Sequence, residues 1–170
     1  MLQSVQGFAS EPNQELNRAI AGFYNVYLKV HPLGIPQAKD WPKLRSYLSA
    51  SLRNQLETAR RAEQQYQKAN RGEVPPLIEG DLFSSLFEGA TNFRVVGCDV
   101  NGATGLCSVE FIHVDPRDKS SFKWKDKAYA VREANRWLLD DVEYLGDWQF
   151  MHKGRLKDVL KAVIEDSKRK

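Results

Sequence analysis

NFRVVGCDVNGATGLCSVEFIHV, residues 92–114, alternates between apolar and polar side chains on both sides of a short turn. The turn is the run Asn101-Gly102-Ala103-Thr104-Gly105, in which asparagine and glycine tolerate positive φ. Alternation with a period of two is typical of a half-buried β-strand, and two such segments joined by a tight turn form a hairpin. Residues 92–100 and 106–114 are therefore predicted to pair as antiparallel strands.

Two further strand-like segments follow the hairpin. FKWKDKAYAV (122–131) and RWLLDDVEY (136–144) are separated near Ala134-Asn135. A final amphipathic helix is predicted from apolar side chains at helical spacing, namely Leu156, Val159, Leu160, Val163 and Ile164. The C-terminal half is therefore predicted to be an antiparallel sheet of about four strands, followed by a helix.

The N-terminal half has the period of helices instead. Apolar residues recur at steps of four and three, at Leu16, Ile20, Phe23, Tyr27 and Val30. A short helix capped by Asp40 is predicted to run through Leu48. A longer helix follows over 50–69, with a C-terminal half that exposes Arg60, Gln64 and Lys68. The apolar connection 73–91 is expected to pack as a lid or wrap. We expect residues 1–12 to be a loose lead-in and 13–170 to be a single α+β domain.

Composition and charge argue against several classes of protein. Of 170 residues, 42% are hydrophobic, which is enough apolar surface for one buried core. The 25 basic residues are nearly balanced by 22 acidic ones, so nucleic-acid binding is not expected. No apolar run approaches the roughly 20 residues of a membrane helix, and no signal peptide is visible at the start. Export followed by trimming of the N-terminus is compatible with this sequence.

Two segments resemble a known superfamily. AIAGFYNVYLKV (19–30) resembles the Phe-Tyr-x-x-Tyr-Leu signature of a bacterial family of unknown function with the nuclear-transport-factor-2-like fold. RWLLDDVEYLG (136–146) resembles the Trp-hydrophobic-hydrophobic-Asp-Asp-hydrophobic strand of the same superfamily. The resemblance covers roughly residues 13–165 and implies a cystatin-like roll, with helices on one face of a curved antiparallel sheet. Members include isomerases, dehydratases, immunity proteins and ligand-binding lipoproteins, so the resemblance implies a fold rather than one chemistry.

Cys98 and Cys107 are the only cysteines in the sequence. A turn centred between Gly102 and Ala103 would place them directly opposite one another on the hairpin. A two-residue type I′ turn at Asn101-Gly102 would make the pair diagonal. The sequence is compatible with two alternatives, a pair of buried thiols or a cross-strand disulfide. A disulfide would imply an oxidising compartment.

No metal and no cofactor are expected. The chain has no Cys-x-x-Cys motif, and His31, His113 and His152 show no i, i+4 pairing. These residues do not supply the four tetrahedral ligands of a zinc site unless further ligands come from distant parts of the chain.

Asp140-Asp141 is the candidate for acid–base chemistry, because isomerases of the superfamily place acids on the sheet beside an apolar cavity. Alternation would place Trp137 and Asp141 on one face, with Asp141 at the mouth of that cavity. Burial there would raise the pKa of the carboxylate, which could act as a base with Tyr24 or Tyr27 as hydrogen-bond donor. The alternative is structural: both acids end the strand and meet backbone or arginine partners.

Five side chains could line a ligand cleft, namely Tyr24, Tyr27, Trp124, Arg132 and Trp137. Aromatic residues at helical or strand spacing are more often part of a core. The leading hypothesis is a non-enzymatic binding protein, periplasmic or secreted, from a bacterium. It would bind a small apolar ligand in the concave cavity, or a protein partner or second copy of itself on an exposed face. The rival hypothesis is a cofactor-independent lyase or isomerase with Asp141 as base, which an open pocket reaching Asp141 would favour.

Overall fold

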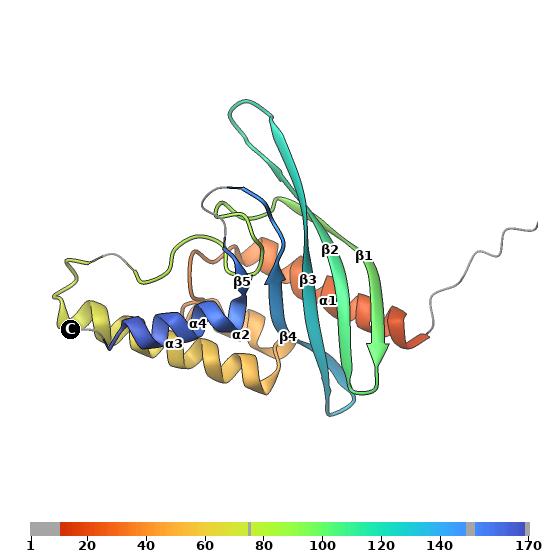
Figure 1. Ribbon diagram of the computed structural model, residues 1–170, viewed down its shortest axis with the longest axis horizontal. Coiled ribbons are helices and arrows are strands. Elements are labelled where there is room, and N and C mark those ends of the chain that lie inside the picture. The colour runs from red at the N-terminus through yellow and green to blue at the C-terminus, as the bar shows by residue number, and fades with distance from the viewer. Residues whose placement is uncertain (1–10, 75, 149–151, 169–170) are drawn as a thin grey trace, which may run out of the picture.

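The fold is α+β, with helices packed on an antiparallel sheet (Figure 1). The computed structural model describes residues 11–74, 76–148 and 152–168. The helical elements are α1 Glu11–Val30, α2 Trp41–Leu44, the short 3-10 helix η1 Arg45–Tyr47, α3 Ala50–Ala69 and α4 Leu156–Asp166. The strands are β1 Asn92–Asn101, β2 Thr104–Val114, β3 Ser121–Glu133, β4 Arg136–Tyr144 and β5 Gly154–Arg155. The predicted fold class is confirmed, with a fifth strand of two residues added to the expected four.

The strands follow one another in the sheet in the order of the chain, and each pairs antiparallel with its neighbour. The β1–β2 turn is centred on Gly102-Ala103, with Gly102 at φ 60°. The β3–β4 turn is made by Ala134 and Asn135, at φ 48° and 61°. The β2–β3 hairpin extends well beyond the rest of the molecule (Figure 1). Local turn residues therefore determine where this sheet reverses.

Two irregularities interrupt the pairing. In β1 the register passes from Val95 opposite Val109 to Gly97 opposite Ser108, so Val96 is an extra residue. In β4 the register skips Asp140, between Leu139 and Asp141. After such a bulge every later side chain changes face. The expected alternation is therefore interrupted, and Asp141 does not share a face with Trp137.

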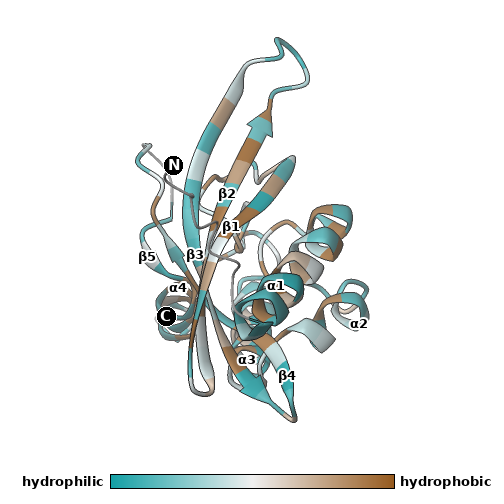
Figure 2. Cartoon of the chain, turned by 90° about the vertical axis from the view of Figure 1, so that its right-hand side faces the viewer, coloured by the Kyte–Doolittle hydropathy of each residue, from teal (hydrophilic) through white to brown (hydrophobic). Residues whose placement is uncertain are grey.

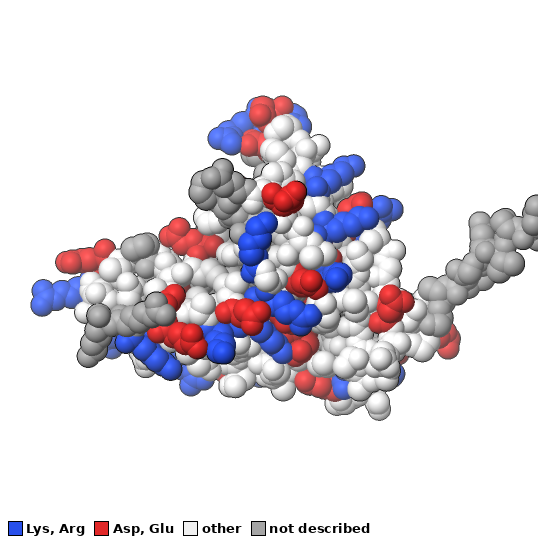
Figure 3. Space-filling view, viewed as in Figure 1, with Lys and Arg blue, Asp and Glu red and all other residues white. Residues whose placement is uncertain are grey.

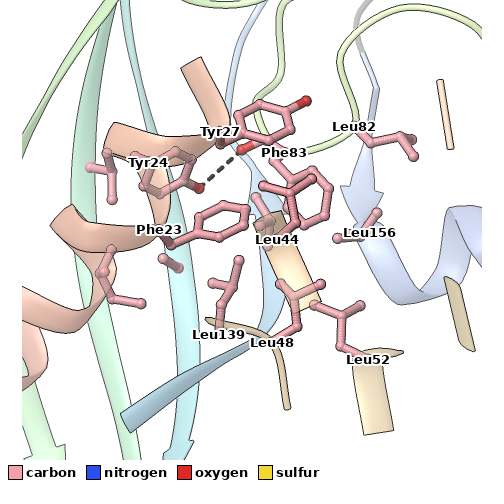
Figure 4. Close-up of a cluster of buried hydrophobic side chains, with 14 of the residues drawn as sticks. Phe23, Tyr24, Tyr27, Leu44, Leu48, Leu52, Leu82, Phe83, Leu139 and Leu156 are labelled. Atoms are coloured by element: carbon pink, nitrogen blue, oxygen red, sulfur yellow. Dashed lines mark hydrogen bonds between the residues drawn. The ribbon is translucent and has the colours of Figure 1, made fainter. Parts of the chain in front are cut away.

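The core fills the space between α1 and the sheet. Figure 2 shows α1 and α2 on one side of β1, β2 and β3. The buried side chains of α1 are Leu16, Ile20, Phe23, Tyr24 and Tyr27. Gly105 of β2 permits this approach, because a Cβ there would collide with the side chain of Leu16. Figure 4 shows part of this core. Each large apolar side chain that is fully buried contributes about 1.5–3 kcal/mol, so the core holds α1 against the sheet.

The second helical layer consists of α3 and α4. α3 begins with Ser49, whose Oγ accepts from the backbone N–H of Leu52 at 3.0 Å. Its bounds match the predicted helix, and Gln64 and Lys68 are exposed while Arg60 is half-buried. α4 packs against α3 and β4. No helix among the described residues is both long enough and apolar enough to span a bilayer.

The connection 73–91 packs against the core, as expected, although it contains no helix or strand among its described residues. Its buried residues include Ile78, Leu82 and Phe83. The face drawn in Figure 3 carries acidic and basic side chains intermixed. That mixture differs from the one-signed face of a typical nucleic-acid binder.

Candidate functional site

Three tyrosine hydroxyl groups hold the 80–89 loop in place. Tyr24 donates to the carbonyl oxygen of Phe83 at 3.0 Å, the bond drawn dashed in Figure 4. Tyr27 donates to Oδ1 of Asp81 at 2.7 Å, and Tyr144 donates to the carbonyl oxygen of Leu82 at 2.6 Å. Burial raises the pKa of all three tyrosines, so the hydroxyl groups stay protonated as donors.

Asp81 organises the start of this loop. Its Oδ1 also accepts from the backbone N–H groups of Phe83 at 2.7 Å and Ser84 at 3.0 Å. The side chain is buried, and burial raises the pKa of Asp81 to about 6. His152 donates from Nε2 to the carbonyl oxygen of Asp81 at 2.9 Å, and burial lowers the pKa of His152, which favours the neutral ring. The loop is therefore tied at several points to α1 and to the segment before β5.

Asp126 of β3 anchors the middle of the same loop, at Ser85. Its carboxylate accepts from the backbone N–H groups of Ser85 at 2.8 Å and Leu145 at 2.9 Å, and from Nε1 of Trp124 at 3.0 Å. The hydroxyl group of Ser85 also donates to it. Burial raises the pKa of Asp126. Tyr24, Tyr27 and Trp124, predicted to line a ligand cleft, thus belong to one buried network and have protein partners there.

A pocket of about 340 Å³ lies beside this loop, between the α1–α2 connection, α3 and residues 76–80. It is lined by Leu33, Ile35, Gln37, Glu63, Pro76, Ile78, Glu79, Gly80 and Phe87, and is called the Glu63 pocket below. Most of these side chains are apolar, and two of them at the rim, Leu33 and Phe87, are 74% and 45% exposed. Pockets for small molecules have volumes of about 300–1,000 Å³ and mostly apolar walls with few polar groups. The Glu63 pocket fits that description at its lower end.

Glu63 is the buried ionisable group of this pocket. Its side chain comes from α3 and the residue is only 6% exposed. Oε1 accepts from the backbone N–H of Ile78 at 3.3 Å, and burial raises the pKa of the carboxyl group. A charged group held in such an environment gains from an oppositely charged or hydrogen-bonding partner. Glu63 is therefore the group through which the pocket could recognise a polar atom.

The pocket wall is fixed by backbone contacts to the 80–89 loop. Gly34 donates to the carbonyl oxygen of Gly80 at 2.7 Å, and Asp81 donates to that of Phe87 at 2.9 Å. Gly80 has φ 79°, and a Cβ there would lie 2.6 Å from the ring of Phe87. The buried network thus holds two lining residues in place. A wall fixed before binding reduces the entropy that a ligand must overcome.

Arg132 and Trp137 lie in a different place. The guanidinium of Arg132 sits 5.7 Å from the centre of the Trp137 ring and 3.6 Å from the carboxylate of Glu15. Trp137 lines a pocket of about 240 Å³ that also includes Arg18 and Arg136. Its Nε1 is buried and has no hydrogen-bond partner among the described residues. The five predicted cleft residues are therefore divided between two regions of the molecule.

Asp141 supports the start of α4. Its Oδ1 accepts from the backbone N–H groups of Val142 at 2.9 Å and Lys157 at 3.1 Å, and Oδ2 lies 3.4 Å from Arg155. Burial raises the pKa of Asp141. Asp140 accepts from the side chains of Ser49 and Lys157. Asp141 thus has the backbone and arginine partners of the structural alternative, whereas Asp140 meets a serine and a lysine. Neither acid ends the strand, because β4 continues to Tyr144.

Cys98 and Cys107 are directly opposite on β1 and β2 and form a disulfide, with their Cα atoms 4.1 Å apart. This is the arrangement expected when the turn is centred between Gly102 and Ala103. Cys107 is fully buried and Cys98 half-buried. The bond ties the edge strand to its neighbour.

The sequence did not identify Glu63, Asp81 and Asp126 as site residues, although the spacing of Glu63 and Asp126 indicates that they are buried. Glu63 continues the apolar stripe of α3 at the step between Ala59 and Tyr66. Asp126 lies two residues after Trp124 in β3, so both side chains point to the buried face of the strand. Asp81 follows a glycine in an irregular segment, where no periodicity predicts burial.

No group of three or more His, Cys, Asp or Glu side chains that could hold a metal occurs among residues 11–74, 76–148 and 152–168. Comparison of this chain with protein-family models, curated proteins and solved structures found no match in any of the three.

Proposed function

We propose that this protein binds a small, mainly apolar molecule in the Glu63 pocket and is not an enzyme. The observation that carries the proposal is a concave apolar pocket of about 340 Å³ with one buried carboxylate in its wall. The combination of apolar walls, few polar groups and an ionisable group with a perturbed pKa is typical of ligand sites.

The partners of Asp141 favour binding over the rival chemistry. A general base needs an oxygen within reach of a substrate proton. In Asp141 one oxygen accepts two backbone hydrogen bonds and the other faces Arg155. The hydroxyl groups of Tyr24 and Tyr27 have partners on the 80–89 loop. None of these groups lines the Glu63 pocket.

We further propose that the chain is a bacterial member of the nuclear-transport-factor-2-like superfamily and works outside the cytoplasm. The superfamily assignment is supported by the two resembling segments and by helices packed on an antiparallel sheet. The extracytoplasmic location is supported by the disulfide between Cys98 and Cys107, because such bonds persist in oxidising compartments.

The first experiment measures binding of a neutral fluorescent naphthylamine probe by the purified protein. We expect saturable binding, and we expect Phe87→Ala to weaken it at least fivefold, because this ring lines the pocket at its rim. Phe122→Ala is the matched control: Phe122 is 42% exposed against 45% for Phe87, and it lies on the β2–β3 hairpin.

Thermal unfolding should show that both variants remain folded at the binding temperature. Equal weakening in the two variants would place the probe outside the Glu63 pocket. Native mass spectrometry of the protein as purified would add a direct readout, because a retained small molecule or a dimer appears as a mass difference.

A further inference from the structure

We infer that the Glu63 pocket selects ligands that carry a positive charge, that is, apolar molecules with a protonated amine. This inference rests on the proposed small-molecule function and names the chemical class of the ligand. Its basis is the sign and direction of the polar groups around the pocket.

The charges that line the pocket are all negative. Glu63 and Glu79 are its ionisable residues, and no Lys, Arg or His occurs among its described lining residues. Glu63 is buried in the wall, whereas Glu79 is exposed beside it. A carboxylate-bearing ligand would be repelled by both groups, while an ammonium group would be attracted by both.

The polar atoms that line the pocket are also mainly acceptors. Glu63 accepts from the backbone N–H groups of Ile78 and Leu77, and a carboxylate can accept about four hydrogen bonds in total. Gln37 donates one N–H of Nε2 to the carbonyl oxygen of Ile35, which leaves Oε1 as an acceptor and one N–H as a donor. Pro76 contributes no N–H to the pocket. A ligand that brings hydrogen-bond donors therefore matches this lining.

Phe87 adds an aromatic face at the rim. A cation placed over a phenyl ring within about 6 Å is attracted to the negative face of the ring. Burial raises the pKa of Glu63, which reflects the cost of a charged carboxylate in this wall. An ammonium ion beside Glu63 offsets that cost, whereas a neutral alcohol of the same length does so only in part.

The test compares three ligands of equal chain length, octylamine, octanol and octanoate, as competitors of the naphthylamine probe at neutral pH. We expect octylamine to displace the probe at a concentration at least tenfold lower than octanol, and octanoate to be the weakest. Glu63→Gln should remove the advantage of the amine over the alcohol. Glu57→Gln, a half-buried acid of α3 outside the pocket, should keep it.

The outcomes separate this inference from the function on which it rests. If amine and alcohol compete equally, and Phe87→Ala weakens both, the pocket binds small ligands but does not select cations. If the probe shows no saturable binding, the proposed function fails and the inference with it. An amine preference that survives Glu63→Gln overturns the role of Glu63. Should that variant not fold, the ratio of amine to alcohol in the wild-type protein decides.

Discussion

The carboxyl group of Asp81 accepts three hydrogen bonds on one oxygen while it is 3% exposed to solvent. Burial outweighs these bonds and raises its pKa from 3.8 to about 6. A carboxyl group whose pKa is higher in the folded state costs stability only when it ionises. This group therefore contributes most to stability at low pH, where it stays protonated. That contribution is lost as pH rises from about 4 through about 6.

We predict that Asp81→Asn removes this pH dependence. The amide keeps an oxygen for Tyr27, Phe83 and Ser84 but cannot ionise. The shift of about two pKa units corresponds to about 3 kcal/mol. The free energy of unfolding of the variant, relative to wild type, should therefore rise by up to that amount between pH 4 and pH 7.

Urea denaturation at several pH values measures this difference. Asp99→Asn, on the exposed edge strand, is the matched control for the loss of one carboxylate. A constant difference between Asp81→Asn and wild type at all pH values would show that Asp81 ionises at its ordinary pKa.

Single residues differ in how far the sequence predicts their environment. Helical spacing around Tyr24 and Tyr27 predicts that both lie on the buried face of α1. Their hydrogen-bond partners are 59 and 54 residues away, so no local pattern can identify them. Periodicity reports which face is buried, whereas the choice of partner depends on the tertiary fold.

The start of α4 depends on an acceptor from another element. Its N-cap residue is Arg155, whose side chain makes no capping hydrogen bond. Asp141 of β4 takes that role by accepting from the backbone N–H of Lys157. A carboxylate beside a helix N-terminus also interacts favourably with the helix dipole.

We predict that Asp141→Ala lowers the free energy of unfolding by about 1–3 kcal/mol, because buried N–H groups lose their acceptor. Asp141→Asn should cost less than half as much, since the amide oxygen can accept the same bonds. Chemical denaturation followed by far-ultraviolet circular dichroism measures both values. Equal losses in the two variants would mean that the charge of Asp141, rather than its hydrogen bonding, supports α4.

The elements themselves were predicted to different degrees. The β1–β2 and β3–β4 turns contain Gly102 and Asn135, residues that accept positive φ, and both reversals were expected from them. The bulge at Asp140 was not expected, because its sequence continues the strand without a glycine or proline. It moves Asp141 to the face of Tyr129, its partner in β3.

For the whole molecule, the sequence predicted an α+β architecture, because the apolar residues change from a helical to a strand period between the two halves. The sequence did not predict the Glu63 pocket, because its lining comes from three separate segments: the α1–α2 connection, α3 and the connection 73–91. Their proximity is a property of the packed domain. Within α3, the charge of Glu63 suggested solvent exposure, while its place in the apolar stripe indicated burial.

We predict that reduction of the Cys98–Cys107 disulfide lowers the free energy of unfolding of the whole domain by no more than about 3 kcal/mol. The two residues are separated by nine positions, so the bond closes a short loop and restricts the unfolded chain only modestly. Urea denaturation with and without reductant gives the value.

A double variant with serine at both positions should be insensitive to reductant. If reduction instead unfolds the domain, the disulfide is needed for the sheet to form.

The bulge at Val96 affects how the edge strand β1 can pair with an extended segment of another chain. β1 lies at the edge of the described sheet, so one row of its backbone N–H and C=O groups faces away from β2 and is a template for strand addition. The extra residue bends and twists that edge, and Gly97 follows it without a side chain. A foreign strand can therefore align with only one side of the bulge at a time, which limits templated aggregation along this edge.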